Sequence, residues 1–106
     1  MTLHRSEATL LEATVNAAAS GDNTLIAATA GKAIEVYRIV AAVASTVTAT
    51  FKDGSTALTG AISMVVGVPL VLDSLRPWFT TTTGAAFVVS LGSAVQFSGR
   101  IYYRLV

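Results

Sequence analysis

The stretch that most constrains the fold is residues 46–62, TVTATFKDGSTALTGAI. Apolar residues alternate with threonine or lysine through 47–52, which is the pattern of a strand buried on one face. Asp53-Gly54 follows, and glycine accepts the positive φ that tight hairpin turns require. Gly60, in the returning segment, predicts a bulge or a close backbone approach. The stretch therefore predicts a β-hairpin with Phe51 in the core and threonines on its outer face.

The rest of the chain repeats this pattern of short apolar segments between turn residues. Seven or eight strands about ten residues apart predict an all-β fold, an antiparallel β-sandwich or jelly roll. The chain shows no βαβ spacing, which argues against a nucleotide-binding α/β fold. Besides the hairpin, strands are expected at 24–29, 33–43, 65–72, 85–91 and 96–106.

Some of these strands carry more specific expectations. Strict alternation in 33–43 places Arg38 on the same face as Ile34 and Val36, so a bulge or strand end near Arg38 is expected to release its side chain. Pro69 cannot donate to a sheet, which makes 65–72 an edge or kinked strand. Trp78 and Phe79 are expected to cap one end of the core.

The N-terminal segment is expected to be an arm, so the domain boundaries are 1–19 for the arm and 20–106 for the β-sandwich. Residues 8–19 fit either an alternating strand or an alanine-favoured helix. The β-branched residues and the β-rich remainder favour an extended segment, which could reach a neighbouring subunit.

The composition argues for a surface that is covered by partners. Only 12% of the 106 residues are charged, against 53% hydrophobic, and the net charge is +1. A surface so poor in charge fits either a membrane or burial against other proteins. No apolar run reaches about 18 residues, so burial against partners is favoured. The near-neutral charge argues against a nucleic-acid surface, and the lack of cysteine excludes disulfides and thiolate sites.

The residues that could carry chemistry are scattered. His4 is the only histidine, Asp22 and Asp53 lie in expected turns, and no phosphate-binding glycine motif occurs. Alternating Arg100, Tyr102 and Arg104 could stack on bases or sugars, but a solvated or partner-facing strand is the commoner reason for such a pattern. We therefore expect no catalytic residues, no metal site and no cofactor.

Three runs, SGDNTLIAATAGKAIEVYRI, VTATFKDGSTALTGAI and PWFTTTTGAAFVVSLGSAVQFSGRIYYRLV, resemble a group of small virion proteins of tailed bacteriophages. The shared features are a strand ending in AGK-I-V, the Asp-Gly hairpin, a WF-x-T turn and a closing pair of strands. The resemblance spans residues 20–106 and rests mostly on turn and core residues.

The resemblance implies a β-sandwich protein of the phage particle, and within that setting we favour a capsid decoration, or cement, protein. Such a protein would sit as a trimer on the outer capsid surface and brace neighbouring major capsid subunits, without a membrane or nucleic-acid partner. A tail or head-fibre module that binds a host receptor or glycan, with Trp78 and Tyr102 as its aromatics, is the alternative; an enzyme is disfavoured. From position and chemistry, the expected contact residues are Leu3, Leu10, Leu11, Val15, Arg76 and Trp78.

Overall fold

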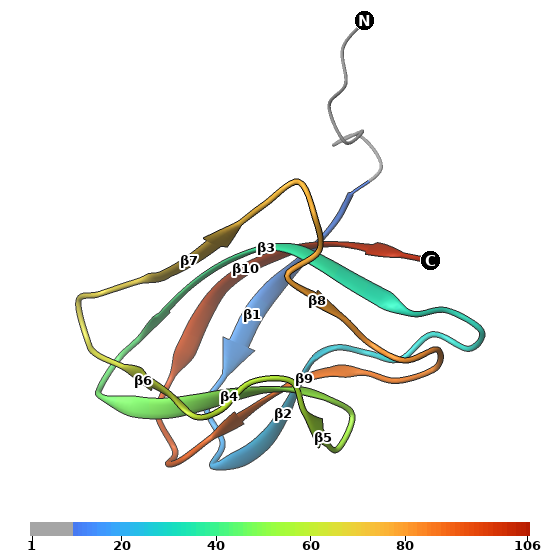
Figure 1. Ribbon diagram of the computed structural model, residues 1–106. Coiled ribbons are helices and arrows are strands. Elements are labelled where there is room, and N and C mark those ends of the chain that lie inside the picture. Colours follow the sequence, from blue (N-terminus) through green and yellow to red (C-terminus); the bar gives the residue numbers. More distant parts are fainter. Residues whose placement is uncertain (1–9) are drawn as a thin grey trace, which may run out of the picture.

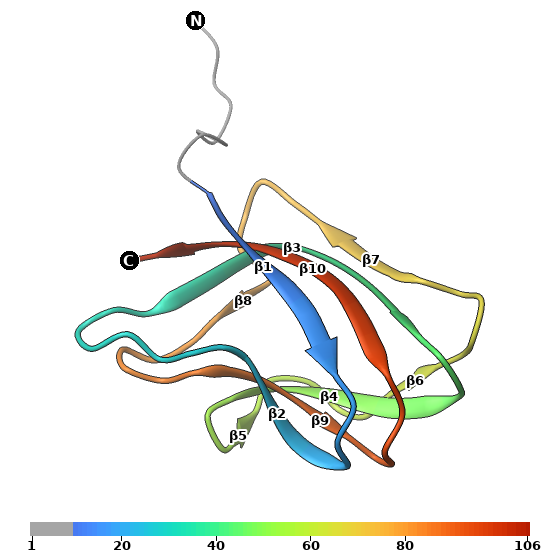
Figure 2. The same ribbon diagram turned by 180° about the vertical axis from the view of Figure 1, so that it is seen from behind.

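The computed structural model describes residues 10–106, which fold into two antiparallel β-sheets packed face to face (Figures 1 and 2). The expected all-β sandwich is confirmed, with ten strands in place of seven or eight. The strands are β1 (Leu11–Ala17), β2 (Gly21–Ile26), β3 (Ile34–Val43), β4 (Val47–Asp53), β5 (Thr56–Ala57), β6 (Ile62–Met64), β7 (Leu70–Asp73), β8 (Phe79–Thr80), β9 (Phe87–Leu91) and β10 (Phe97–Leu105).

Each of the two sheets has five strands. The first sheet has the order β1-β10-β3-β7, with β8 also paired to β3. The second sheet has the order β2-β9-β4-β5, with β6 also paired to β4. The chain crosses between the sheets repeatedly, because each strand buries one face and needs a partner layer opposite it.

The predicted hairpin is present, and its returning strand is interrupted near Gly60, where a bulge was expected. Gly54 takes a φ of 58° in the turn between β4 and β5. The returning chain then bulges, because the N–H groups of Leu58 and Thr59 both donate to the carbonyl of Phe51, at 2.8 and 3.4 Å. The Thr59 hydroxyl in turn accepts the Phe51 N–H at 3.2 Å, before β6 resumes the pairing with β4.

A bulge in β3 corrects the expected faces of that strand. Tyr102 pairs with Arg38 and Tyr103 with Val36, so Tyr37 has no opposite residue on β10. Ile34 and Val36 are fully buried as expected, but beyond the bulge Ile39 and Ala41 are the buried residues, and Arg38 points outward. Strict alternation was therefore wrong beyond Tyr37, while the bulge expected near Arg38 is confirmed.

The four phenylalanines form the centre of the core. Phe51 lies 5.3 Å from Phe79, 5.6 Å from Phe87 and 6.3 Å from Phe97, ring centre to ring centre. Trp78 does not join them, contrary to expectation, and is 46% exposed. Phe79 turns inward at the start of β8, and alternation along the chain then directs Trp78 outward.

The expected extended N-terminal segment is confirmed from Leu11 to Ala17, where β1 pairs with β10 as an edge strand of the first sheet. These residues therefore belong to the sandwich and not to a separate arm ending at residue 19. The reason is the alternation that the sequence shows: Val15 and Ala17 are buried in the core while Glu12, Thr14 and Asn16 face outward.

The packing of β10 against β3 can be tested at Gly99. A Cβ at Gly99 would overlap the Val40 carbonyl oxygen and lie 2.8 Å from the Cα of Ala41, because β10 and β3 approach closely there. We expect Gly99→Ala to lower the free energy of unfolding by about 2 kcal/mol or more, measured by chemical denaturation. Gly60→Ala is the control, since a Cβ there meets nothing within 4 Å; equal stability of the two variants would contradict the close approach.

Candidate functional site

Exposed apolar side chains gather on one edge of the sandwich. Among residues 10–106, six of the eight exposed large apolar side chains lie between residues 65 and 78. We call this group the β7 ridge, because it follows β7 from the crossing that precedes the strand to the turn that follows it (Figure 1). Its members are Val65, Val66, Val68, Val71, Leu75 and Trp78.

The course of the chain explains why these residues are exposed. β6 pairs with β4 in the second sheet and β7 pairs with β3 in the first, so residues 65–69 must cross the open edge between the sheets. Gly67, with a φ of 84°, turns the chain there, and the Val68 N–H donates to the Val65 carbonyl at 3.1 Å. Pro69 lies just before β7, at an edge of the sheet, as its lack of a backbone N–H predicted.

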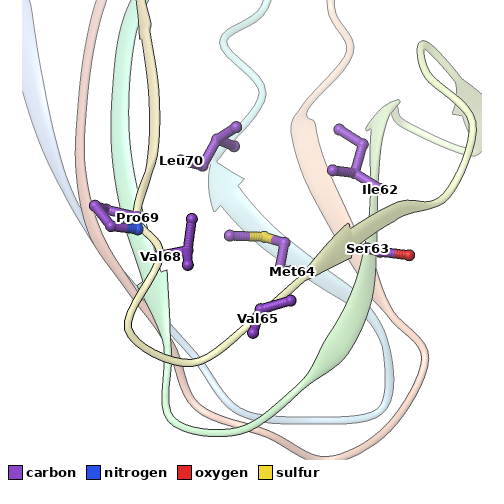
Figure 3. Close-up of a pocket in the computed structure, with 7 residues that line it drawn as sticks. All are labelled: Ile62, Ser63, Met64, Val65, Val68, Pro69 and Leu70. Atoms are coloured by element: carbon purple, nitrogen blue, oxygen red, sulfur yellow. The ribbon is translucent and has the colours of Figure 1, made fainter.

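A hollow opens at the β6–β7 end of the ridge (Figure 3). It has a cavity volume of about 130 Å³ and lies between the edges of the two sheets. Met64 extends from β6 towards Val68, while the Ser63 hydroxyl points away from the space between the apolar side chains. The lining residues are Ile62, Ser63, Met64, Val65, Val68, Pro69 and Leu70.

The other end of the ridge is the turn between β7 and β8. The Ser74 hydroxyl accepts a hydrogen bond from the backbone N–H of Arg76 at 3.1 Å, and the backbone N–H of Trp78 donates to the Val36 carbonyl at 2.7 Å. These bonds fix the backbone, while the side chains of Leu75, Arg76 and Trp78 are exposed. Within the described residues the Arg76 guanidinium makes no ion pair. An exposed indole beside an uncompensated cation is typical of a protein-binding surface.

The outer face of the first sheet contains the Arg100, Tyr102 and Arg104 alternation noted in the sequence. Arg100 pairs with Glu12 on β1, and the Arg104 guanidinium lies 2.9 Å from the Glu35 carboxylate and 5.5 Å from the Tyr37 ring centre. The hydrogen bond to Glu35, reinforced by Tyr37, raises the pKa of Arg104 above its usual value. Arg100 and Arg104 are therefore each paired with a carboxylate of the same chain, so this face does not present a row of unpaired positive charges.

Arg38 joins this face because of the bulge in β3. Its guanidinium lies 5.7 Å from the ring centre of Tyr102, as a cation–π contact. Its Nε and that of Arg104 are buried without a hydrogen-bond partner. The face is thus a mixed layer of cations, carboxylates and tyrosine rings that stack on one another.

Other polar groups have structural partners. Asp53 accepts the Thr82 N–H at 2.9 Å and so joins the hairpin turn to the threonine loop, while Asp22 pairs with Lys52 at 3.0 Å. The part of the chain that the structure describes has no cluster of three residues able to hold a metal ion. Nor does that part contain a helix long and apolar enough to cross a membrane.

The structure places the expected contact residues in different surroundings. Arg76 and Trp78 lie together in the β7–β8 turn, and both are exposed. Leu11 is exposed at the start of β1, Leu10 is half-buried, and Leu3 lies outside the described residues. Val15 is 2% exposed and packs in the core of its own chain.

Sequence reasoning placed residues 65–72 in an edge or kinked strand and did not identify the exposed valines of the ridge among them. The available signal was the sequence VVGVP, in which glycine and proline bracket valines that have no alternating partner.

The threonine clusters divide into outward and inward residues. Thr46, just before β4, and Thr48, on β4, are exposed, as expected. Thr81, by contrast, is 3% exposed, and its hydroxyl accepts the Ile34 N–H at 2.9 Å. Thr81 therefore holds the threonine loop against β3 and presents no surface for assembly.

This bond can be measured by substitution. Thr81→Val keeps the shape of the side chain but leaves the buried Ile34 N–H without its acceptor, so we expect a loss of about 1–3 kcal/mol in the free energy of unfolding. Thr83→Val, at an exposed position of the same loop, should change stability by less than about 0.5 kcal/mol. Equal effects in chemical denaturation would contradict a structural role for Thr81.

Comparison with known proteins found no protein family, no curated protein and no solved structure that matches this chain.

Proposed function

We propose that this chain is a non-enzymatic structural protein of a phage particle, of the capsid decoration type. It would bind the outer capsid surface and stabilise neighbouring major capsid subunits, assembling there as the trimer that the sequence resemblance implies. The observation that carries the proposal is the β7 ridge, an apolar surface on a chain with few charges. A surface of this kind favours contact with other proteins over exposure to water.

The β7–β8 turn is the part of the ridge best suited to bind a capsid subunit. Leu75 is 68% exposed and Trp78 46%, so both have apolar area left to bury. Each Å² of apolar surface removed from water contributes about 25 cal/mol before the cost of association. Arg76 adds a cation that makes no ion pair with any other described residue, which suits a carboxylate on the capsid.

The backbone of this turn supports recognition because it is fixed before binding. Pro77 restricts the chain, and the Trp78 N–H is hydrogen-bonded to β3. Little conformational entropy is lost when such a turn binds, so more of the burial energy appears as affinity.

The fibre alternative requires Trp78 and Tyr102 to share a binding groove. Neither residue lines the hollow, and Tyr102 packs against Arg38 on the outer face of the first sheet. The capsid interpretation is therefore the one we favour, and a glycan array with the isolated chain tests the alternative.

The proposal is tested by returning the purified chain to capsids stripped of surface proteins. We expect binding in co-sedimentation and a higher capsid melting temperature in calorimetry. Trp78→Ala should weaken binding at least about tenfold, since buried tryptophans dominate many protein interfaces.

Thr24→Ala, at an exposed position on β2, is the matched control and should bind as the unmodified chain does. Circular dichroism should show both variants folded. Capsids that neither bind the chain nor gain stability from it would refute the proposal. Binding to glycans that is lost in Trp78→Ala would favour the fibre alternative instead.

A further inference from the structure

The turn of the hairpin contains a dipeptide whose own chemistry can rearrange the backbone. Asp53-Gly54 is the single Asp–Gly pair of the sequence, which has no Asn–Gly pair. Glycine has no side chain to hinder attack by its backbone nitrogen on the carboxyl carbon of the preceding aspartate. Asp53 and Gly54 are both half-buried, so the structure around them decides whether this reaction can occur.

The reaction is isomerisation to isoaspartate, and it consumes and releases only water. The Gly54 nitrogen bonds to Cγ of Asp53, and one oxygen of the protonated carboxyl group leaves as water together with the proton of the N–H group. The product is a five-membered succinimide ring. Water then adds at the main-chain carbonyl carbon of Asp53 and breaks its bond to the Gly54 nitrogen. The chain now continues through Cβ and Cγ, and the former main-chain carbonyl is a free carboxylate.

The fold keeps both reacting groups away from this path. The Asp53 carboxylate accepts the backbone N–H of Thr82 at 2.9 Å on one oxygen and the Thr82 hydroxyl at 3.3 Å on the other. The Gly54 N–H donates to the Ala86 carbonyl at 2.8 Å. Ring closure also requires Cβ of Asp53 to eclipse the Gly54 nitrogen, which the extended backbone at the end of β4 does not allow.

The threonine loop, residues 81–84, supplies Thr82 and is itself anchored to the segment that leads into β3. The Thr81 N–H donates to the Ile34 carbonyl at 2.9 Å, and its hydroxyl accepts the Ile34 N–H at 2.9 Å. The Gly84 N–H donates to the Lys32 carbonyl at 2.8 Å. Breaking these few bonds releases the Asp53 carboxylate while the two sheets stay packed. Local opening of this kind costs less free energy than unfolding the whole chain.

We propose that Asp53-Gly54 is a site of spontaneous isoaspartate formation that the threonine loop keeps unreactive, so that opening of the loop permits the modification. The modified turn is one main-chain atom longer, and its carboxylate branches from Cα, out of place for Thr82. The loop therefore loses this contact with the hairpin once the bond has rearranged. This inference goes beyond the proposed function, because the reaction requires no capsid or other protein.

The first test is peptide mapping by mass spectrometry after the full chain has been incubated at neutral pH. We expect isoaspartate at Asp53 to form at least about tenfold faster in denaturant than in the folded chain, because the orientation of the reacting groups controls such ring closures. A folded chain that reacts as fast as the denatured chain would overturn the inference. A denatured chain that forms no isoaspartate at Asp53 would also overturn it.

A pair of exposed threonines tests the contact with Asp53 directly. Thr82→Val removes the hydroxyl that donates to the carboxylate, and we expect isoaspartate to form about threefold faster or more in the folded variant. Thr83→Val makes the same change at the next position of the loop, which is also exposed, and should react as the unmodified chain does. Equal rates in these two variants would contradict a protective role for Thr82.

A second pair separates opening of the loop from unfolding of the chain. Thr81→Val weakens the anchor of the threonine loop, so we expect isoaspartate to form about fivefold faster or more. Gly99→Ala destabilises the contact of β10 with β3, away from the loop, and should leave the rate unchanged under conditions where the variant is folded. Equal acceleration in both variants would show that the reaction requires global unfolding, and would overturn the role of the loop.

Discussion

The packing of Phe51 is the interaction on which the rest of the structure depends. Its ring packs against rings from both sheets, Phe87 from its own sheet and Phe79 and Phe97 from the opposite sheet. Its backbone carbonyl accepts two N–H groups from the returning strand, which creates the bulge there. Phe51 thus joins the two layers and sets the course of the hairpin, and burial of aromatic rings of this size dominates the energetics of a small core.

Two bulges then determine which surfaces face outward. The bulge opposite Phe51 separates β5 from β6. Residues 65–69 then cross the open edge, because β6 pairs in the second sheet and β7 in the first. The bulge in β3 moves Arg38 from the expected inner face to the outer face beside Tyr102. One irregularity therefore divides the returning strand of the hairpin, and the other removes a charge from the core.

The result is a molecule whose surfaces differ in chemistry. The outer face of the first sheet satisfies most of its charges internally, and the second sheet presents threonine hydroxyls. Within residues 10–106, the β7 ridge gathers most of the exposed large apolar side chains and has few charges. A surface divided in this way fits the proposed role of a protein that is held among other proteins.

The sequence by itself determined the fold class, the hairpin, the edge character of the segment around Pro69 and the extended form of the N-terminal segment, because period-2 alternation and turn chemistry are local properties. It also singled out Arg76 and Trp78, although it expected Trp78 to cap the core. Tertiary structure decided the rest. The face of the sheet on which Arg38 lies depends on a register shift of β3 against β10. The burial of Thr81 depends on its hydrogen bond with an N–H group of β3, and the hollow depends on how the edges of the two sheets lie relative to each other. Each of these joins residues far apart in the chain, and local pattern carries no information about such pairings.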